Sequence, residues 1–342
     1  MTTLLDSPPN ATPTPTAAAP GGSASPDRIL GLRCRGCGTL RPIGVAYVCD
    51  RCFGPLEVAY DLPAIRPTVS RDTIAARSAG IWRYLELLPL DERPARLLAV
   101  GSTPLVSADR LGPALGVERL WLKDDTRNPT LSFKDRAVAI ATATALRFGL
   151  PVLACASTGN LAGATAAAAA AAGLRSLVVI PADLEPAKIE HALAYGASVL
   201  PVEGTYDDVN RLCLEIADET GWGFVNVNLR PFYAEGSKTL AFEVAEQLGW
   251  RTPDVIVSPI ASGALFTKLA EGFEQLAAIG LIERRPVRYV GAQAAGCGPV
   301  ATAWASGSDV VRPVREPDTF VRSLAIGSPA DGAYAAALAT SS

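Results

Sequence analysis

Apolar runs alternate with longer amphipathic stretches along most of the chain, from about residue 63 onward. Each short run is rich in Val, Ile and Leu, and the stretch after it repeats its apolar residues at helical spacing. Strands that are apolar throughout, each followed by a helix, are typical of parallel sheets covered by helices. The predicted strand–helix pairs are 118–125 with 132–149, 151–157 with 160–173, 175–181 with 187–196, 197–203 with 206–221, and 254–260 with 264–280. The pattern therefore predicts an α/β protein with parallel-rich sheets flanked by helices.

Residues 1–28, ahead of this alternation, are rich in Pro, Thr, Ala, Ser and Gly. Such a composition cannot bury enough apolar surface to order the backbone, so we expect a disordered tail. The segment has no Lys or Arg before Arg28. This composition is typical of neither a secretory signal nor an Arg-rich transit peptide.

Residues 29–62 contain two CxxC pairs, each in a Gly-rich turn. The first pair is Cys34 with Cys37, and the second is Cys49 with Cys52. Two such turns can place four thiolates around one zinc ion, and metal binding then supplies folding energy to a module too small for its own core. We therefore predict a small zinc-ribbon-like module. A pair of reduced CxxC turns without metal is the alternative.

Composition narrows the chemistry that the chain can perform. Its 342 residues carry a net charge of −3, which argues against binding to nucleic acid. No apolar run reaches the roughly 18 residues of a membrane span, so we expect a cytoplasmic protein. The chain has a single histidine, His191, within a predicted helix, where a structural or surface role is expected. A proton carrier in an active site would therefore be a lysine, a carboxylate or a cofactor.

Lys134 is one of only five lysines and lies at the predicted start of the helix 132–149. Ser132 and Asp135 fit an S-x-x-D capping pattern around it. The positive end of the helix dipole disfavours a protonated amine in the first turn, and a neutral amine is the form that makes an imine. Locally, a surface lysine paired with Asp135 explains the position equally well.

Two further strand-to-helix turns are candidates for binding anions through helix N-termini. The turn at 157–160 combines backbone N–H groups with two hydroxyls and an amide, and the turn at 262–264 consists of small residues. A third polar segment, 226–238, contains Asn, Arg, Tyr, Glu, Ser and Lys just before another predicted helix; a solvated loop is the alternative there. A lysine that forms imines, several anion sites and almost no histidine together favour an enzyme that uses pyridoxal phosphate.

The motifs GSTPL, NPTLSFKDRA, STGN, EGSKT and GAQAAGCGPVATA, followed by SLAIGSPADG, resemble those of the threonine synthases. The resemblance runs from about residue 30 to the end of the sequence and includes the cysteine ribbon that some members carry. It implies a two-domain, tryptophan synthase β-like fold of type II, and a homodimer. It also implies a large cofactor domain over 63–130 and 235–342, and a smaller substrate-binding domain over 131–234.

The resemblance further implies the reaction and the residues that carry it. O-phospho-L-homoserine and water would give L-threonine and phosphate, so the partner is a small phosphorylated amino acid. Lys134 would hold pyridoxal 5'-phosphate as an imine and move protons. The remaining implied cofactor contacts are Phe133, Asn160, Ser262, Gly263, Ala264 and Leu265. The implied substrate contacts are Ser157, Thr158 and Gly159 for the carboxylate, and Ser237 and Lys238 for the phosphate.

Three departures from the family pattern lead to expectations of their own. Leu131 stands where many relatives have Gly, so we expect a stiffer loop before Lys134. The turn IASGAL is poorer in glycine than most versions of the family's phosphate loop. The sequence ends at DGAYAAALATSS, whereas relatives continue, so we expect a large domain truncated at its C-terminus. The alternatives are a threonine or serine dehydratase, a cysteate synthase, or a truncated inactive paralogue that acts as a binding protein.

Overall fold

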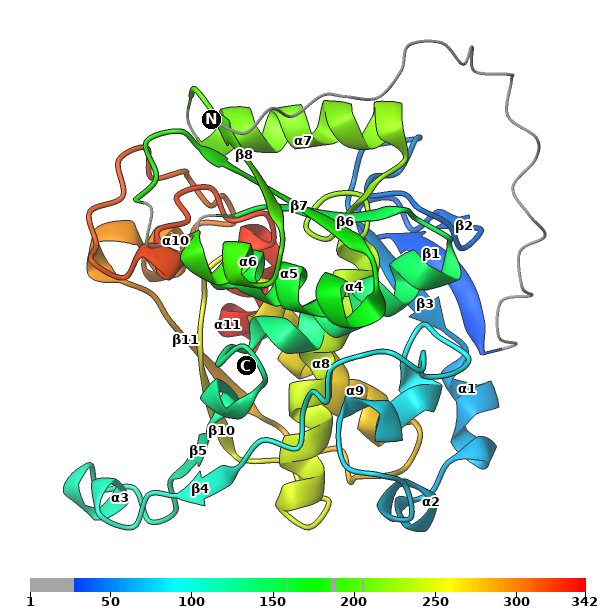
Figure 1. Ribbon diagram of the computed structural model, residues 1–342. Helices are drawn as coiled ribbons and strands as arrows, with labels where there is room; N and C mark the ends of the chain where they lie inside the picture. Colours follow the sequence, from blue (N-terminus) through cyan, green and yellow to red (C-terminus); the bar gives the residue numbers. More distant parts are fainter. Residues whose placement is uncertain (1–27, 158, 186–188, 205) are drawn as a thin grey trace, which may run out of the picture.

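The computed structural model describes residues 28–157, 159–185, 189–204 and 206–342 (Figure 1). Residues 1–27 of the predicted tail lie outside the described residues. Arg28, the last residue of that predicted tail, instead belongs to the ribbon, because its carbonyl oxygen accepts a hydrogen bond of 2.8 Å from the Asp61 N–H.

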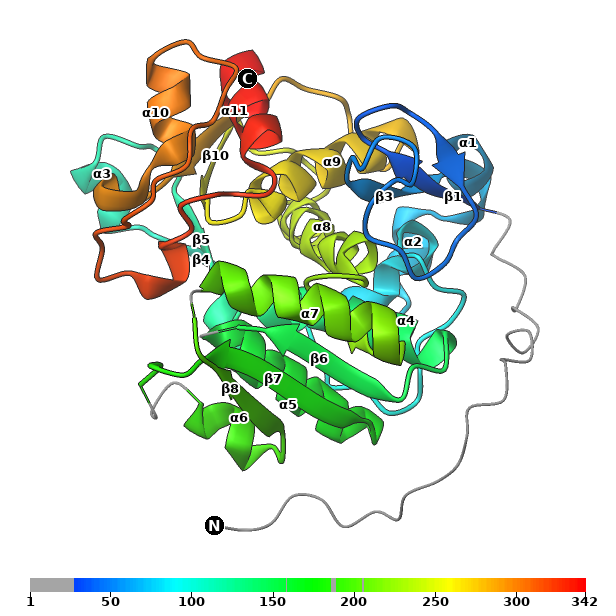
Figure 2. The same ribbon diagram turned by 90° about the horizontal axis from the view of Figure 1, so that it is seen from above.

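A four-stranded parallel sheet forms one side of the molecule, with the strand order β8-β7-β6-β9. Its strands are β6 (Val152–Ala156), β7 (Arg175–Pro181), β8 (Ser198–Val202) and β9 (Gly223–Phe224). The helices around it are α4 (Lys134–Arg147), α5 (Asn160–Ala172), α6 (Glu190–Ala194) and α7 (Tyr206–Thr220). Figure 2 shows α7 lying along one face of this sheet.

Successive residues of β6 explain why this strand is apolar throughout. Val152 and Ala154 pack with residues of α7, whereas Leu153 and Cys155 pack with α4 and α5 on the other face. Since side chains alternate between the two faces of a strand, a sheet covered on both sides needs an apolar residue at every position. The predicted α/β class with parallel sheets is therefore confirmed.

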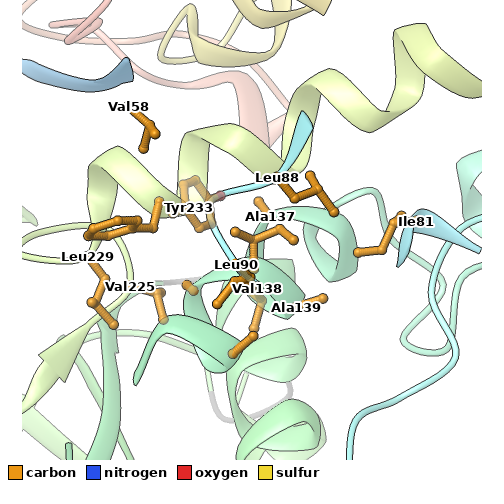
Figure 3. Close-up of a cluster of buried hydrophobic side chains, with 14 of the residues drawn as sticks. Val58, Ile81, Leu88, Leu90, Ala137, Val138, Ala139, Val225, Leu229 and Tyr233 are labelled. Carbon is orange, nitrogen blue, oxygen red and sulfur yellow. The ribbon is translucent and has the colours of Figure 1, made fainter. Parts of the chain in front are cut away.

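A long helix, α8 (Arg230–Gln247), crosses the middle of the molecule and packs against α4 and against α9 (Ala264–Ala278). Side chains of α4 and α8, including Ala137 and Tyr233, meet in the main core (Figure 3). The segment 226–238 was expected to precede its helix. The structure corrects this, because α8 already begins at Arg230. The helix also runs across the predicted domain boundary between residues 234 and 235.

A second, smaller parallel sheet pairs β10 (Val255–Pro259) with β11 (Arg288–Ala292). The helices α10 (Pro299–Ala305) and α11 (Gly332–Ser341) follow it in the chain. An antiparallel pair, β4 (Leu105–Ser107) with β5 (Trp121–Lys123), extends from the body together with α3 (Leu111–Ala114) (Figure 1). Three short 3₁₀ helices lie at Asp125–Arg127, Ala295–Cys297 and Arg322–Leu324. All the strands and helices of the predicted pairs are present.

The ribbon is an antiparallel sheet of β1 (Ile29–Cys34), β2 (Leu40–Arg41) and β3 (Leu56–Tyr60), with the order β2-β1-β3. The short helices α1 (Leu62–Ile65) and α2 (Arg71–Ala75), and the 3₁₀ helices Arg66–Thr68 and Ile81–Leu87, connect it to the rest of the chain. Leu32 and Val58 of the ribbon belong to the same apolar core as α4 and α8. The ribbon is therefore packed into the body of the protein.

Within the described part of the chain, no helix is both long enough and apolar enough to cross a membrane.

Candidate active site

Lys134 is the first residue of α4, and its side chain is half-buried. The Lys134 Nζ donates a hydrogen bond of 3.1 Å to the hydroxyl oxygen of Tyr233 on α8. The same Nζ lies 5.7 Å from the centroid of the Tyr233 ring and 6.0 Å from that of the Phe133 ring. Lys134 is thus a primary amine held from the neighbouring helix, beside two aromatic rings.

The predicted capping box at this helix does not form. Phe133 is the N-cap residue of α4, and the Ser132 Oγ accepts a hydrogen bond from the Lys134 N–H at 3.1 Å. The Asp135 carboxylate instead accepts two hydrogen bonds of 2.7 Å from Thr130, one from its N–H and one from its hydroxyl. The backbone turns at Leu131, whose φ is +56°, and this turn brings Thr130 against Asp135. Asp135 is therefore occupied by Thr130, which argues against the pairing of a surface Lys134 with Asp135.

Arg136, two residues after Lys134, is fully buried and fixes the first turn of α4. Its guanidinium group contacts carboxylate oxygens of Asp125 at 2.7 and 2.9 Å and of Glu243 at 2.8 Å. Burial would raise the pKa of Glu243, but hydrogen bonds and charge from Arg136 and Lys123 outweigh burial and lower this pKa to about 2. The sequence analysis missed this network, because Asp125, Arg136 and Glu243 are far apart in the chain and the only local signal was the motif KDR.

The turn between β6 and α5 lies at the carboxyl end of the parallel sheet, where ligands of such folds bind. Ser157 is buried, and its Oγ accepts a hydrogen bond of 3.2 Å from the Gly159 N–H. Because the N-cap residue is Gly159, its side chain cannot compete for the first N–H groups of α5, which suit an anion. A Cβ at Gly159 would meet no heavy atom within 4 Å, so there is open space beside this turn. Asn160 is the exposed first residue of α5.

Thr158, the other predicted substrate contact in this turn, lies outside the described residues. Two of the asparagines in the segment 226–238 have structural partners. Asn226 exchanges two hydrogen bonds of 3.2 Å with the backbone of Ala156, at the end of β6. Asn228 contacts the backbone of Phe224 at 2.7 Å and that of Trp222 at 2.8 Å. These amides fix the ends of β6 and β9 and so support the Ser157 turn.

The turn between β10 and α9 contains the predicted phosphate residues Ser262, Gly263, Ala264 and Leu265. Gly263 is the N-cap residue of α9 and has a φ of +95°, a left-handed conformation that favours glycine. A Cβ at Gly263 would lie 2.8 Å from the carbonyl oxygen of Asp331. The start of α9 is thus a tight turn that a neighbouring segment of backbone covers closely.

Ser237 and Lys238 lie on a different face of α8 from Tyr233 and are fully buried. Residues five apart on a helix point about 140° from one another, so Tyr233 and Lys238 cannot face the same site. Lys238 pairs with Glu235, and its Nζ lies 3.9 Å from the centroid of the Tyr60 ring in the ribbon. The structure therefore does not bring Lys238 together with Lys134, and contact between Lys238 and a substrate phosphate requires α8 to move.

Four cysteines of the ribbon form the candidate metal centre. The Sγ atoms of Cys34, Cys37, Cys49 and Cys52 all lie within 4.8 Å of one another. The Cys34 and Cys52 sulfurs are 3.4 Å apart, and the Cys37 and Cys49 sulfurs are 3.8 Å apart. Tetrahedral zinc with Zn–S bonds of about 2.3 Å places its sulfurs roughly 3.8 Å apart, so the cluster fits a structural zinc ion.

Comparison with known proteins decides the family. Residues 96–342 match the family model described as pyridoxal-phosphate dependent enzyme. The threonine synthase of Methanocaldococcus jannaschii is 34% identical over 300 residues, which cover 87% of this chain and 73% of that protein. The threonine synthase of Methanosarcina acetivorans is 33% identical over 306 residues, which cover 89% and 74%. The chain belongs to the threonine synthase family of pyridoxal-phosphate-dependent enzymes.

Solved structures confirm the fold that this family implies. A bacterial threonine deaminase, from T.th., superimposes with a TM-score of 0.56 at 24% identity and covers 77% of this chain and 79% of its own. The processed form of threonine deaminase isoform 2 from Solanum lycopersicum gives a TM-score of 0.58 at 23% identity and covers 69% and 66%. The fold of this threonine synthase relative is therefore that of the type II pyridoxal-phosphate enzymes, as the sequence predicted.

The residues present fit pyridoxal phosphate. A half-buried primary amine, Lys134, suits the aldehyde of the cofactor, and the glycine turn at Gly263 offers backbone N–H groups to its phosphate. The open space beside Gly159 lies at the other helix N-terminus. The sequence analysis discussed Tyr233 only as part of the polar segment, whereas the structure makes it the direct partner of Lys134.

Proposed function

We propose that this chain catalyses the threonine synthase reaction, in which O-phospho-L-homoserine and water give L-threonine and phosphate. The family relationship supports the choice of reaction. The observation that carries the assignment to this site is the Lys134 amine at the start of α4, 3.1 Å from the Tyr233 hydroxyl. Lys134 is then the lysine that binds the cofactor.

The chain's own residues would divide the work as follows. When bound, pyridoxal phosphate stabilises the negative charge left when protons are removed from the substrate carbons. The Lys134 Nζ removes and returns those protons, and the Tyr233 hydroxyl keeps Nζ oriented toward them. Ser157 and the N–H groups at the start of α5 bind the substrate carboxylate, and the turn Ser262–Leu265 binds the cofactor phosphate.

A lysine-labelling experiment tests this assignment. The purified protein should show the visible absorbance of bound pyridoxal phosphate, and borohydride should bleach it and fix the cofactor to one peptide. Because the chain has only five lysines, peptide mapping distinguishes Lys134 from the others. A Lys134→Ala variant should lose both the absorbance and the release of phosphate from O-phospho-L-homoserine. Cofactor fixed to another lysine would refute the site.

Substrate assays separate the proposed reaction from the related lyases. The wild-type protein should release phosphate from O-phospho-L-homoserine faster than from O-phospho-L-serine. A dehydratase would instead release ammonia from threonine or serine, and a cysteate synthase would favour phosphoserine. Release of ammonia from threonine without turnover of phosphohomoserine would overturn the proposal.

We also propose that the four ribbon cysteines bind one structural zinc ion. The sulfur separations of 3.4 and 3.8 Å support this. Metal analysis should find about one zinc per chain in the wild type and none in Cys34→Ser. Cys297→Ser is the matched control, because Cys297 is a buried cysteine outside the cluster and should keep the metal. Equal zinc contents in the wild type and Cys34→Ser would refute the metal site.

The predicted homodimer, the cytoplasmic location and the division into a large and a small domain are further proposals. Light scattering of the purified protein tests the first, with an expected mass of twice 35.6 kDa.

A further inference from the structure

We propose that the cysteine ribbon controls cofactor binding through an ion-pair clamp formed by Arg35, Asp331 and Arg230. The clamp joins the ribbon to the start of α9, where the cofactor phosphate is proposed to bind. The inference therefore rests on the proposed function. Arg35 and Asp331 would be positioning residues, because neither is placed against the reacting atoms.

Asp331 is the centre of the clamp. It is only 5% exposed, and each of its carboxylate oxygens accepts a hydrogen bond from a different guanidinium group. The Arg35 Nη1 lies 3.1 Å from Oδ1, and the Arg230 Nη2 lies 2.6 Å from Oδ2. Hydrogen bonds between charged groups are about twice as strong as neutral ones, so these two contacts hold Asp331 firmly between the ribbon and α8.

The backbone of Asp331 contacts the proposed phosphate turn directly. The Asp331 N–H donates a hydrogen bond of 2.8 Å to the carbonyl oxygen of Ser262. The next residue, Gly263, has a φ of +95°, and a Cβ there would overlap the Asp331 carbonyl oxygen at 2.8 Å. Because no side chain separates the two segments, a displacement of Asp331 displaces the turn that begins α9.

The position of Arg35 is set by the ribbon. Arg35 lies between Cys34 and Cys37, and its N–H donates a hydrogen bond of 2.9 Å to the Pro55 carbonyl oxygen. The Arg35 guanidinium carbon lies 3.4 Å from the centroid of the Tyr334 ring in α11. Figure 2 shows the ribbon and α11 on either side of α9. The cysteine turn thus determines where the Arg35 side chain can reach.

The chain of contacts from the cysteines to α9 is therefore continuous. A bound metal fixes the turn of Cys34 and Cys37, the turn aims Arg35, and Arg35 fixes Asp331 against Ser262 and Gly263. Loss of the metal would release Arg35 and loosen the turn, and so weaken cofactor binding without removing any residue that touches the cofactor.

Cofactor titration tests the clamp. Cofactor-free full-length protein is titrated with pyridoxal phosphate, and binding is followed by absorbance, with zinc content measured in parallel. Arg35→Ala should bind the cofactor about tenfold more weakly than the wild type while keeping its zinc. Arg33→Ala is the matched control, because Arg33 is an exposed arginine two residues away and should bind like the wild type. Asp331→Asn, which keeps the shape of the side chain, should resemble Arg35→Ala.

Removal of the metal supplies the decisive comparison. Chelation should weaken cofactor binding about tenfold in the wild type and should add nothing in Arg35→Ala. Equal cofactor affinities in Arg35→Ala and Arg33→Ala would overturn the proposal. An equal effect of chelation on the wild type and on Arg35→Ala would overturn it too. A wild-type protein that binds no pyridoxal phosphate refutes the proposed function instead, so the two failures are distinguishable.

Discussion

The ammonium group of Lys134, on α4, donates its hydrogen bond to the hydroxyl of Tyr233, on α8, at 3.1 Å. The candidate nucleophile is thus oriented by a residue 99 positions away in the chain. The Tyr233 side chain is 9% exposed and packs in the core shared by the two helices (Figure 3). The orientation of Lys134 therefore depends on how closely α4 and α8 pack.

Tyr233→Phe should impair the reaction and leave the fold intact. The substitution keeps the ring in the core and removes only the hydroxyl that orients the Lys134 Nζ. We expect kcat to fall about 10- to 100-fold, a substantial part of what a positioned proton carrier contributes, with little change in KM or in cofactor absorbance. Tyr195→Phe is the control, because Tyr195 is 38% exposed and contacts His191 on α6. Equal kcat values for the two variants would exclude the role of the Tyr233 hydroxyl.

Sequence periodicity predicted the helices that have one apolar side, but not the start of α8. This helix carries buried residues all around, among them Tyr233, Glu235 and Lys238. Its charged residues are buried because they pair with each other and with Tyr60 and Lys268, contacts that sequence spacing does not show. The polar segment was therefore predicted to be a loop, although the motif EGSKT within it correctly indicated the family.

The candidate site shows the same limit. Each strand-to-helix turn could be found from the sequence, because a strand that ends in small and polar residues before a helix is a local pattern. The partners that fix those turns lie elsewhere in the chain. Asp331 contacts the Ser262 turn from 69 residues away, and Arg35 contacts Asp331 across 296 residues. Only the folded structure brings these residues together.

Gly236→Ala should separate α4 from α8. A Cβ at Gly236 would lie 2.2 Å from the Arg136 carbonyl oxygen and 2.6 Å from the Ala137 Cα, so the backbone of α4 must shift. Overpacking of this kind typically costs about 1–3 kcal/mol of unfolding free energy. Because Lys134 begins the same helix, we also expect lower activity. Urea unfolding measures the first effect.

Gly44→Ala is the matched control for this substitution. A Cβ at Gly44 would meet no heavy atom within 4 Å. We expect this variant to unfold at nearly the same urea concentration as the wild type. If Gly236→Ala were as stable as Gly44→Ala, the close approach of α4 and α8 would be contradicted.

Leu131→Gly should stabilise the protein. Leu131 has a φ of +56° and is 72% exposed, so its side chain gains little from burial while its backbone is strained. The left-handed conformation costs a residue other than glycine about 1–2 kcal/mol, and the greater freedom of glycine in the unfolded chain offsets roughly half of that. We therefore expect a gain of about 0.5–1 kcal/mol in thermal or urea unfolding. Leu131→Ala keeps the strain and should show no gain. A loss of stability in Leu131→Gly would contradict the strain.

Glu235→Gln should make the protein less stable at neutral pH and less sensitive to acid. Burial would raise the pKa of Glu235, but the charges of Lys238 and Lys268 outweigh burial and lower it from its ordinary 4.5 to about 2. A carboxyl group whose pKa is lowered by folding stabilises the fold above its unfolded pKa, and this stabilisation is lost as the pH falls through the folded pKa. The shift corresponds to about 3 kcal/mol.

The pH dependence of urea unfolding checks this sign. Between pH 5 and pH 2 the wild type should lose about 3 kcal/mol more unfolding free energy than Glu235→Gln does. Glu283→Gln, in which a 72% exposed carboxylate is neutralised, should follow the wild type. At pH 7, removing the carboxylate leaves the buried ammonium of Lys238 without its partner, at a cost of about 3–5 kcal/mol. The double variant Glu235→Gln, Lys238→Met should recover part of that loss, because it removes the unpaired charge as well. A double variant no more stable than Glu235→Gln would show that the loss does not arise from the stranded lysine.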